Sequence, residues 1–142
     1  MSHQNINKNQ SSNGDITPMG NVDGIQPNNF EAEQAVLGAV LLGGTNTFEL
    51  ANGWIKNIQA FYHRDHKTIW KSMQNLYREH AILDVVTISN EARKYLEPND
   101  NTKHFAYYIT GLYEACPSAH TVEEYAKIVW ERYIKREAIR SA

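Results

Sequence analysis

The stretch EAEQAVLGAVLL, residues 31–42, constrains the fold of this chain most. It is a nearly uncharged apolar block, but it is far shorter than the ~20 apolar residues that a membrane-spanning helix needs. A long polar stretch precedes it, which does not fit a secretory signal sequence. The two glycines that follow, Gly43 and Gly44, are typical of a helix end. We therefore predict that this block is a buried core helix.

Both the ends and the faces of this helix can be predicted. Asn28 or Asn29 is suited to cap it, because a short amide side chain accepts hydrogen bonds from the free backbone N–H groups of a first turn. Glu31 and Glu33 are expected to lie against the positive end of the helix dipole. Four branched residues are expected on the inner face, namely Val36, Leu37, Val40 and Leu41. Three small residues on the other side should let neighbouring helices approach closely, namely Ala35, Gly38 and Ala39.

The rest of the chain continues the helical pattern. Further helices are expected at residues 47–56, 63–80, 85–96 and 102–115, and from Thr121 to the end. Within the 63–80 segment, Ile69, Met73 and Leu76 share one face. A short strand is the alternative at residues 85–88, where β-branched residues follow one another. The predicted fold class is all-α, a small orthogonal bundle of about six helices.

The last helix has apolar residues on two faces. Val122, Ala126, Val129 and Tyr133 form one stripe, which should dock on the rest of the domain. Ile128 and Ile139 fall on a second face together with Arg132, for which no intramolecular partner is evident. Either these are scattered surface isoleucines, or the helix meets another chain or continues into further sequence.

Composition narrows the class of protein and the compartment. The 142 residues include 14 basic and 16 acidic side chains, so the overall charge does not favour nucleic-acid binding. The one cysteine, Cys116, excludes an intramolecular disulfide and suits a reducing compartment, so we expect a soluble cytoplasmic protein. Residues 1–26 are predicted to be a disordered tail, because they offer too little apolar surface to offset the entropy of ordering. A globular helical domain is expected at residues 27–120.

A search for catalytic patterns finds little. His63 and His66 are three residues apart on a predicted helix, a spacing that can bind a metal, but His80 on the same face is about 21 Å away along the helix. We expect solvated or helix-capping histidines, with a metal site as the alternative. No phosphate-binding glycine loop is present. We predict no catalytic, cofactor-binding or metal-binding residues in this chain.

Four segments of the chain resemble one known family in order and spacing. They are PNNFEAEQAVLGAVLL (27–42), FYHRDHKTIWKSMQNLY (61–77), LDVVTISNEARKYL (83–96) and YYITGLYEACPSAHTVEEYAKIVWERYIKREAI (107–139). They are similar to the N-terminal domain of bacterial replicative DNA helicases of the DnaB type. The most specific pieces are PxxxEAEQxVLGxxL near the start and YAxIVxExxxxR near the end.

This resemblance implies an all-helical collar domain without catalysis of its own, in which residues 121–142 begin a helical hairpin. Such domains associate in a hexamer and recruit the C-terminal domain of primase, with a helicase loader as a possible further partner. ATP and Mg²⁺ would be bound, and DNA mainly contacted, by an ATPase domain that is not in this chain. The primase-facing surface would include Tyr108 and Ile139, and Ile128 and Arg132 are added as candidate partner-binding residues from the helix projection.

Two other hypotheses remain open on the sequence alone. One is a stand-alone helical adaptor, and the other is a small metalloenzyme that uses His63 and His66.

Overall fold

The computed structural model describes residues 28–141, and that part of the chain contains six α-helices and no strand. Two short 3-10 helices accompany them. In chain order the elements are α2 (Phe30–Gly43), α3 (Thr45–Trp54), η2 (Ile58–Ala60), α4 (Arg64–Arg78), α5 (Val85–Ala92), η3 (Arg93–Tyr95), α6 (Thr102–Ala115) and α7 (Val122–Ser141). The all-α prediction is confirmed. The tail predicted at residues 1–26 lies outside the described residues.

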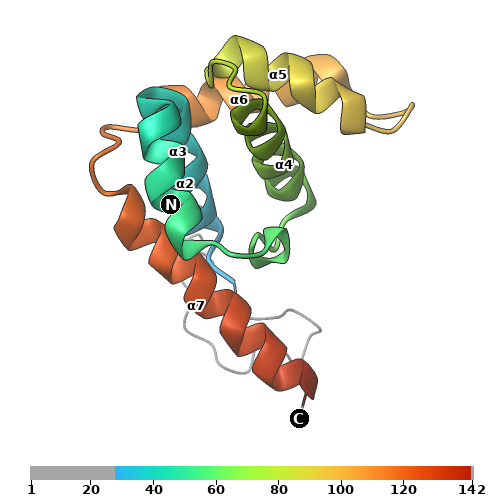
Figure 1. Cartoon of the computed structure of the whole chain (residues 1–142). Helices are drawn as coiled ribbons and strands as arrows, with labels where there is room; N and C mark the ends of the chain where they lie inside the picture. The colour runs from blue at the N-terminus through green and yellow to red at the C-terminus, as the bar shows by residue number, and fades with distance from the viewer. Residues whose placement is uncertain (1–27, 142) are drawn as a thin grey trace, which may run out of the picture.

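Helix α2 is the central element of the bundle. It contacts α3, α4, α6 and α7, whereas α5 packs against α4 and α6 on the far side. Figure 1 shows α7 lying across the α2–α3 pair and then running on, away from the rest of the bundle, towards the C-terminus. The C-terminal end of α7 therefore lies away from the other helices.

The predicted ends of α2 are confirmed. The Asn29 side chain accepts a hydrogen bond from the backbone N–H of Ala32 at 2.9 Å. At the other end Gly44 has a φ of 77°, a left-handed conformation that favours glycine, and its N–H donates to the carbonyl of Val40 at 2.7 Å. The four residues predicted for the inner face are all buried, namely Val36, Leu37, Val40 and Leu41.

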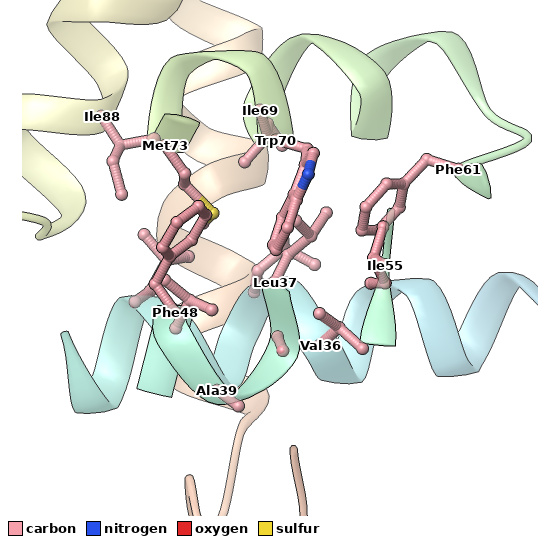
Figure 2. Close-up of a cluster of buried hydrophobic side chains, with 14 of the residues drawn as sticks. Val36, Leu37, Ala39, Phe48, Ile55, Phe61, Ile69, Trp70, Met73 and Ile88 are labelled. Atoms are coloured by element: carbon pink, nitrogen blue, oxygen red, sulfur yellow. The ribbon is translucent and has the colours of Figure 1, made fainter. Parts of the chain in front are cut away.

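Aromatic side chains fill the space between α2 and α4. Figure 2 shows Trp70 of α4 between Phe48 of α3 and Phe61, which follows η2. The ring centroid of Trp70 lies 4.8 Å from that of Phe48 and 5.2 Å from that of Phe61. All three side chains are fully buried, so α3 and α4 share one core with the inner face of α2.

The small side of α2 is where α6 approaches closely. A Cβ atom placed on Gly38 would lie 2.7 Å from the carbonyl oxygen of Leu112 and 3.2 Å from the Cβ of Cys116. The backbones of α2 and α6 therefore meet at a position that only glycine allows. This confirms the expectation that small residues let a neighbouring helix come close.

The strand alternative at residues 85–88 is wrong. Asp84 caps α5 by accepting a hydrogen bond from the N–H of Thr87 at 2.9 Å, and the Thr87 hydroxyl accepts from the N–H of Asp84 at 3.0 Å. This reciprocal capping box fixes the first turn as helix despite its β-branched residues. The helix is shorter than the predicted range of residues 85–96, because α5 ends at Ala92 and the 3-10 helix η3 follows.

Helix α7 confirms its first predicted stripe and corrects its second. Val122, Ala126 and Val129 are buried in the core. Ile128, expected to lack an intramolecular partner, is partly buried and packs against that core. Ile139 is 41% exposed, because this end of α7 lies beyond the bundle. No described helix is both long enough and apolar enough to cross a membrane.

Leu37→Ala should lower the free energy of unfolding by about 2–5 kcal/mol, because Leu37 is fully buried and the bundle cannot close the cavity. Urea denaturation followed by circular dichroism measures this change. Leu42→Ala is the matched control on the same helix, since Leu42 is 41% exposed, and should cost less than about 1 kcal/mol. A loss below about 1 kcal/mol for Leu37→Ala would contradict the central position of α2.

Gly38→Ala should destabilise the chain by about 1–3 kcal/mol, since the added methyl group pushes the backbones of α2 and α6 apart. Gly111→Ala in α6 is the control, because a Cβ there meets open space. Its expected effect is a gain of up to about 1 kcal/mol from helix propensity. Thermal unfolding of the two variants should therefore shift in opposite directions, and equal shifts would show that the close approach does not matter.

Candidate docking groove and the buried network beside it

A groove of about 550 Å³ lies between α2 and α6 and is also lined by the start of α7. We call it the α2–α6 groove. Its lining is mostly apolar and aromatic, with Glu31 and His104 as the ionisable groups besides tyrosine and cysteine; it consists of Glu31, Gln34, Ala35, His104, Tyr107, Tyr108, Gly111, Leu112, Ala115, Cys116, Pro117, Ser118, Thr121 and Tyr125. Tyr107 is 72% exposed. Such a groove suits an apolar segment of another molecule better than a polar metabolite.

A second cavity of about 480 Å³ lies beside the start of α4. It is lined by Phe30, His63, Arg64, Asp65, His66, His104, Phe105 and Tyr108. Tyr108 and His104 line both spaces. Tyr108 therefore stands at the boundary between the groove and the α4 side of the bundle.

Two hydrogen bonds hold the hydroxyl of Tyr108. Its oxygen lies 2.6 Å from Nε2 of His66, and Nε2 of Gln34 donates to it at 3.1 Å. The rings of Tyr108 and His66 are stacked at an interplanar angle of 13°, with centroids 5.9 Å apart. Burial raises the pKa of Tyr108 above its ordinary value. This tyrosine, expected from the sequence to contact a partner, is thus half-buried and fixed in place rather than freely exposed.

Behind Tyr108 lies a buried ionisable pair. Nδ1 of His66 is 2.7 Å from Oε1 of Glu33, and each side chain is only 1% exposed. The other carboxylate oxygen of Glu33 accepts the backbone N–H of Tyr62 at 2.8 Å. Glu33 lies in the first turn of α2, as predicted, and its carboxylate is a buried acceptor that reaches α4. The expectation of a solvated or capping histidine is wrong for His66, which is buried in this pair.

His63 occupies the N-cap position of α4, but its side chain makes no capping hydrogen bond, so the expected capping role is not fulfilled. Its Nε2 lies 3.1 Å from the Oδ1 of Asn28. Burial holds the pKa of His63 below its ordinary value, and the nearby Glu33 carboxylate offsets part of this effect. Neutral His63 is therefore favoured by the folded chain.

Arg136 ties α7 to η2. Its guanidinium donates to the carbonyl oxygens of Gln59 at 2.8 Å and Ala60 at 3.0 Å. It also lies over the rings of Tyr62 and Tyr133, at 5.1 and 5.6 Å from their centroids. Burial lowers the pKa of Arg136 from its ordinary value. Arg136 was not predicted from the sequence as a functional residue, although it continues the stripe of Val129 and Tyr133 at helical spacing.

The four candidate partner-binding residues do not form one site. Tyr108 lines the α2–α6 groove, and Ile128 packs against the core. Ile139 lies 14 positions beyond Tyr125, the α7 residue that reaches the groove, which is about 21 Å along the helix. Arg132 is half-buried between these two positions of α7. Two separate surfaces are therefore available, the groove and the end of α7.

The metal-site alternative finds no support in the geometry. Within residues 28–141, no group of three or more His, Cys, Asp or Glu side chains is arranged to hold a metal ion. Both ring nitrogens of His66 already have protein partners, Glu33 and Tyr108.

The fold and the groove define a small helical bundle domain, and comparisons with known proteins agree on its family. A family model described as the DnaB-like helicase N terminal domain matches residues 25–131. The replicative DNA helicase DnaC of Bacillus subtilis is 34% identical over 122 residues, which are 84% of this chain. DnaB of Geobacillus stearothermophilus is 35% identical over 120 residues, or 83% of this chain.

A solved structure gives the same result. The N-terminal domain of DnaB helicase from Mycobacterium tuberculosis superposes with a TM-score of 0.73 and 26% identity, over 82% of this chain and 80% of that one. This chain belongs to the family of DnaB-like helicase N-terminal domains. It spans about a quarter of the length of the replicative helicases it matches, 26% and 25% for the two relatives named above.

The depressed pKa of His63 predicts a loss of stability in mild acid. Because the unfolded chain binds a proton at the ordinary value of 6.5 and the folded chain resists it, stability should fall as the pH drops below 6.5. His63→Gln should therefore lose less thermal stability than the parent chain between about pH 7 and pH 5. His120→Gln, at an exposed histidine, is the control. Equal decreases in the melting temperature of the parent chain and of the His63 variant over this pH range would refute the prediction.

Proposed function

We propose that this chain is the amino-terminal domain of a replicative DNA helicase, that it docks primase through the α2–α6 groove, and that it helps subunits associate. Family membership supports the first part. The observation that supports the docking role is the groove itself, a largely apolar hollow lined by aromatic residues of α6 and α7. The function of such a domain in DNA replication is then recruitment and assembly rather than chemistry.

The groove has the properties of a contact surface. Aromatic side chains such as Tyr107, Tyr108 and Tyr125 supply large contact areas with little conformational entropy to lose. Helices α2 and α6 are locked together by the close approach at Gly38, so the groove exists before a partner arrives. A preformed site reduces the cost of association. The occupant to which we commit is the C-terminal domain of primase, as the family resemblance implies; a helicase loader is a further candidate partner.

The end of α7 supports the proposal of subunit association. Ile134 and Ile139 are 48% and 41% exposed in the C-terminal half of α7, on either side of the contact that Arg136 makes with η2. Apolar residues on a helix that leaves its own domain suit packing against a neighbouring helix. We propose that α7 begins a helical hairpin that pairs with another subunit in a hexamer.

The chemistry of the helicase is proposed to lie outside this chain. ATP and Mg²⁺ would be bound, and DNA mainly contacted, in the part of the relatives that this chain does not span. The cytoplasm, where replication takes place in bacteria, is the proposed location.

Calorimetric titration with the C-terminal domain of primase from the same organism tests the docking role. Tyr108→Ala should weaken binding by roughly thirtyfold, the effect of losing about 2 kcal/mol at a central aromatic contact. Tyr113→Ala is the matched control, because Tyr113 lies on the same helix and is 40% exposed but does not line the groove. Ile139→Ala in the full-length helicase should also weaken binding, because the family resemblance implies that Ile139 belongs to the primase-facing surface. Ile82→Ala, at an exposed loop position, should not.

Absence of binding to both this chain and the full-length hexamer would overturn the primase assignment. Equal losses for Tyr108→Ala and Tyr113→Ala would place the contact elsewhere on α6.

A further inference from the structure

The contacts around Tyr108 determine which way its hydroxyl hydrogen points. A carboxylate only accepts hydrogen bonds, so Nδ1 of His66 donates to Glu33 across the 2.7 Å contact. In a neutral imidazole the other nitrogen, Nε2, is then an acceptor. The hydroxyl of Tyr108, 2.6 Å away, must therefore donate its hydrogen to Nε2. Gln34 donates to the same hydroxyl, so every donor in the series Gln34, Tyr108, His66 and Glu33 faces an acceptor.

One ring hydrogen on His66 is enough to satisfy this whole network. A second hydrogen, on Nε2, would face the hydroxyl of Tyr108 and displace the hydroxyl hydrogen from the acceptor that lies 2.6 Å away. The hydroxyl already accepts from Gln34, so it would then meet two donors. The geometry is therefore matched when Nδ1 carries the hydrogen and Nε2 accepts.

The direction of the Tyr108 hydroxyl hydrogen affects which groups of a partner the groove can bind. With its only hydrogen directed to His66, the hydroxyl of Tyr108 offers further contacts only as an acceptor, through an oxygen lone pair. The oxygen lies between Gln34, which lines the groove, and His66, which lines the second cavity. Glu31, an exposed carboxylate on the first turn of α2, is another acceptor that lines the groove. Both groups therefore match donors on a partner.

We propose that the buried Glu33–His66 pair sets the hydrogen-bonding polarity of Tyr108, so that the α2–α6 groove selects a partner segment with a nitrogen donor, an amide or a basic side chain, at this point. Glu33 and His66 are positioning residues, because they act through Tyr108. This inference rests on the proposed docking role of the groove and adds to it the chemistry of the partner.

Glu33→Gln reverses the polarity without changing the size of the side chain. The backbone N–H of Tyr62 makes the shorter contact with the carboxylate, at 2.8 Å against 3.4 Å for the N–H of His63. The amide oxygen of the new side chain is therefore expected to keep the contact with Tyr62, and its NH₂ group then faces Nδ1 of His66. His66 then takes the other tautomer, and its Nε2–H donates to Tyr108. The hydroxyl hydrogen of Tyr108 is released from His66 and becomes available to the groove. A partner that brings a donor would then meet another donor.

The tautomer can be read without any partner. ¹⁵N NMR of histidine-labelled protein distinguishes a protonated ring nitrogen from an unprotonated one, and His66 is assigned through its proximity to the Tyr108 ring. We expect protonated Nδ1 and bare Nε2 in the parent chain, and the opposite in Glu33→Gln. Glu31→Gln, the same chemical change at an exposed position, should leave His66 as in the parent. Protonated Nε2 in the parent chain, in either the neutral or the charged ring, would overturn the proposal whatever the variants do.

Binding to the primase C-terminal domain tests the effect on the groove. Glu33→Gln should weaken binding by about tenfold, which corresponds to about 1.4 kcal/mol. In the Tyr108→Phe background it should have no effect, because the hydroxyl through which it acts is gone. An equal loss in both backgrounds would mean that Glu33 acts through general stability, and would overturn the proposal. If the parent chain does not bind primase at all, the docking role fails by itself, while the NMR result still decides the tautomer.

Discussion

Helix α2 is buried at the centre of the bundle, and the helices that pack against it take their positions from their contacts with it. Four helices pack around it, and two requirements make this possible: branched apolar residues towards α3 and α4, and a glycine where α6 approaches. The contact at Gly38 places the backbone of α6 directly against α2. Because α6 is held so closely, the residues flanking this contact form the walls of a groove, and the groove needs no rearrangement to exist.

A polar network also connects α2 to its neighbours, through Glu33 in the first turn of the helix. Glu33 links α2 to α4 through His66 and to the segment after η2 through the N–H of Tyr62, while Arg136 fastens α7 to η2. Such groups are costly to bury unless every donor has an acceptor. These contacts join α2 to α4 and to the segment after η2, and they join η2 to α7. The polar network therefore helps to hold α4 and α7 in their places around α2.

Much of the fold could be predicted from the sequence because its signals are local. Apolar spacing located α4 through Ile69, Met73 and Leu76, and turn chemistry located the ends of α2 and the start of α5. The candidate site was predicted less well. Tyr108 was identified through the family resemblance, but its partners were not, because Gln34 and His66 are 74 and 42 residues away in sequence. Arg136 shares the spacing of the buried stripe, yet its charge argued for the surface.

Sequence patterns were enough to predict a helical chain, the ends of most helices and the buried face of α2, because these depend on hydrogen bonds and side-chain periodicity within a few residues. The family was identified from its sequence motifs. The packing of the helices was needed to show that Glu33 and His66 are buried as a pair and that Tyr108 lies between them and the groove. It was also needed to show that Ile128 contacts the core whereas Ile139 is exposed. Pairings between distant helices depend on how the helices pack, and no local pattern encodes them.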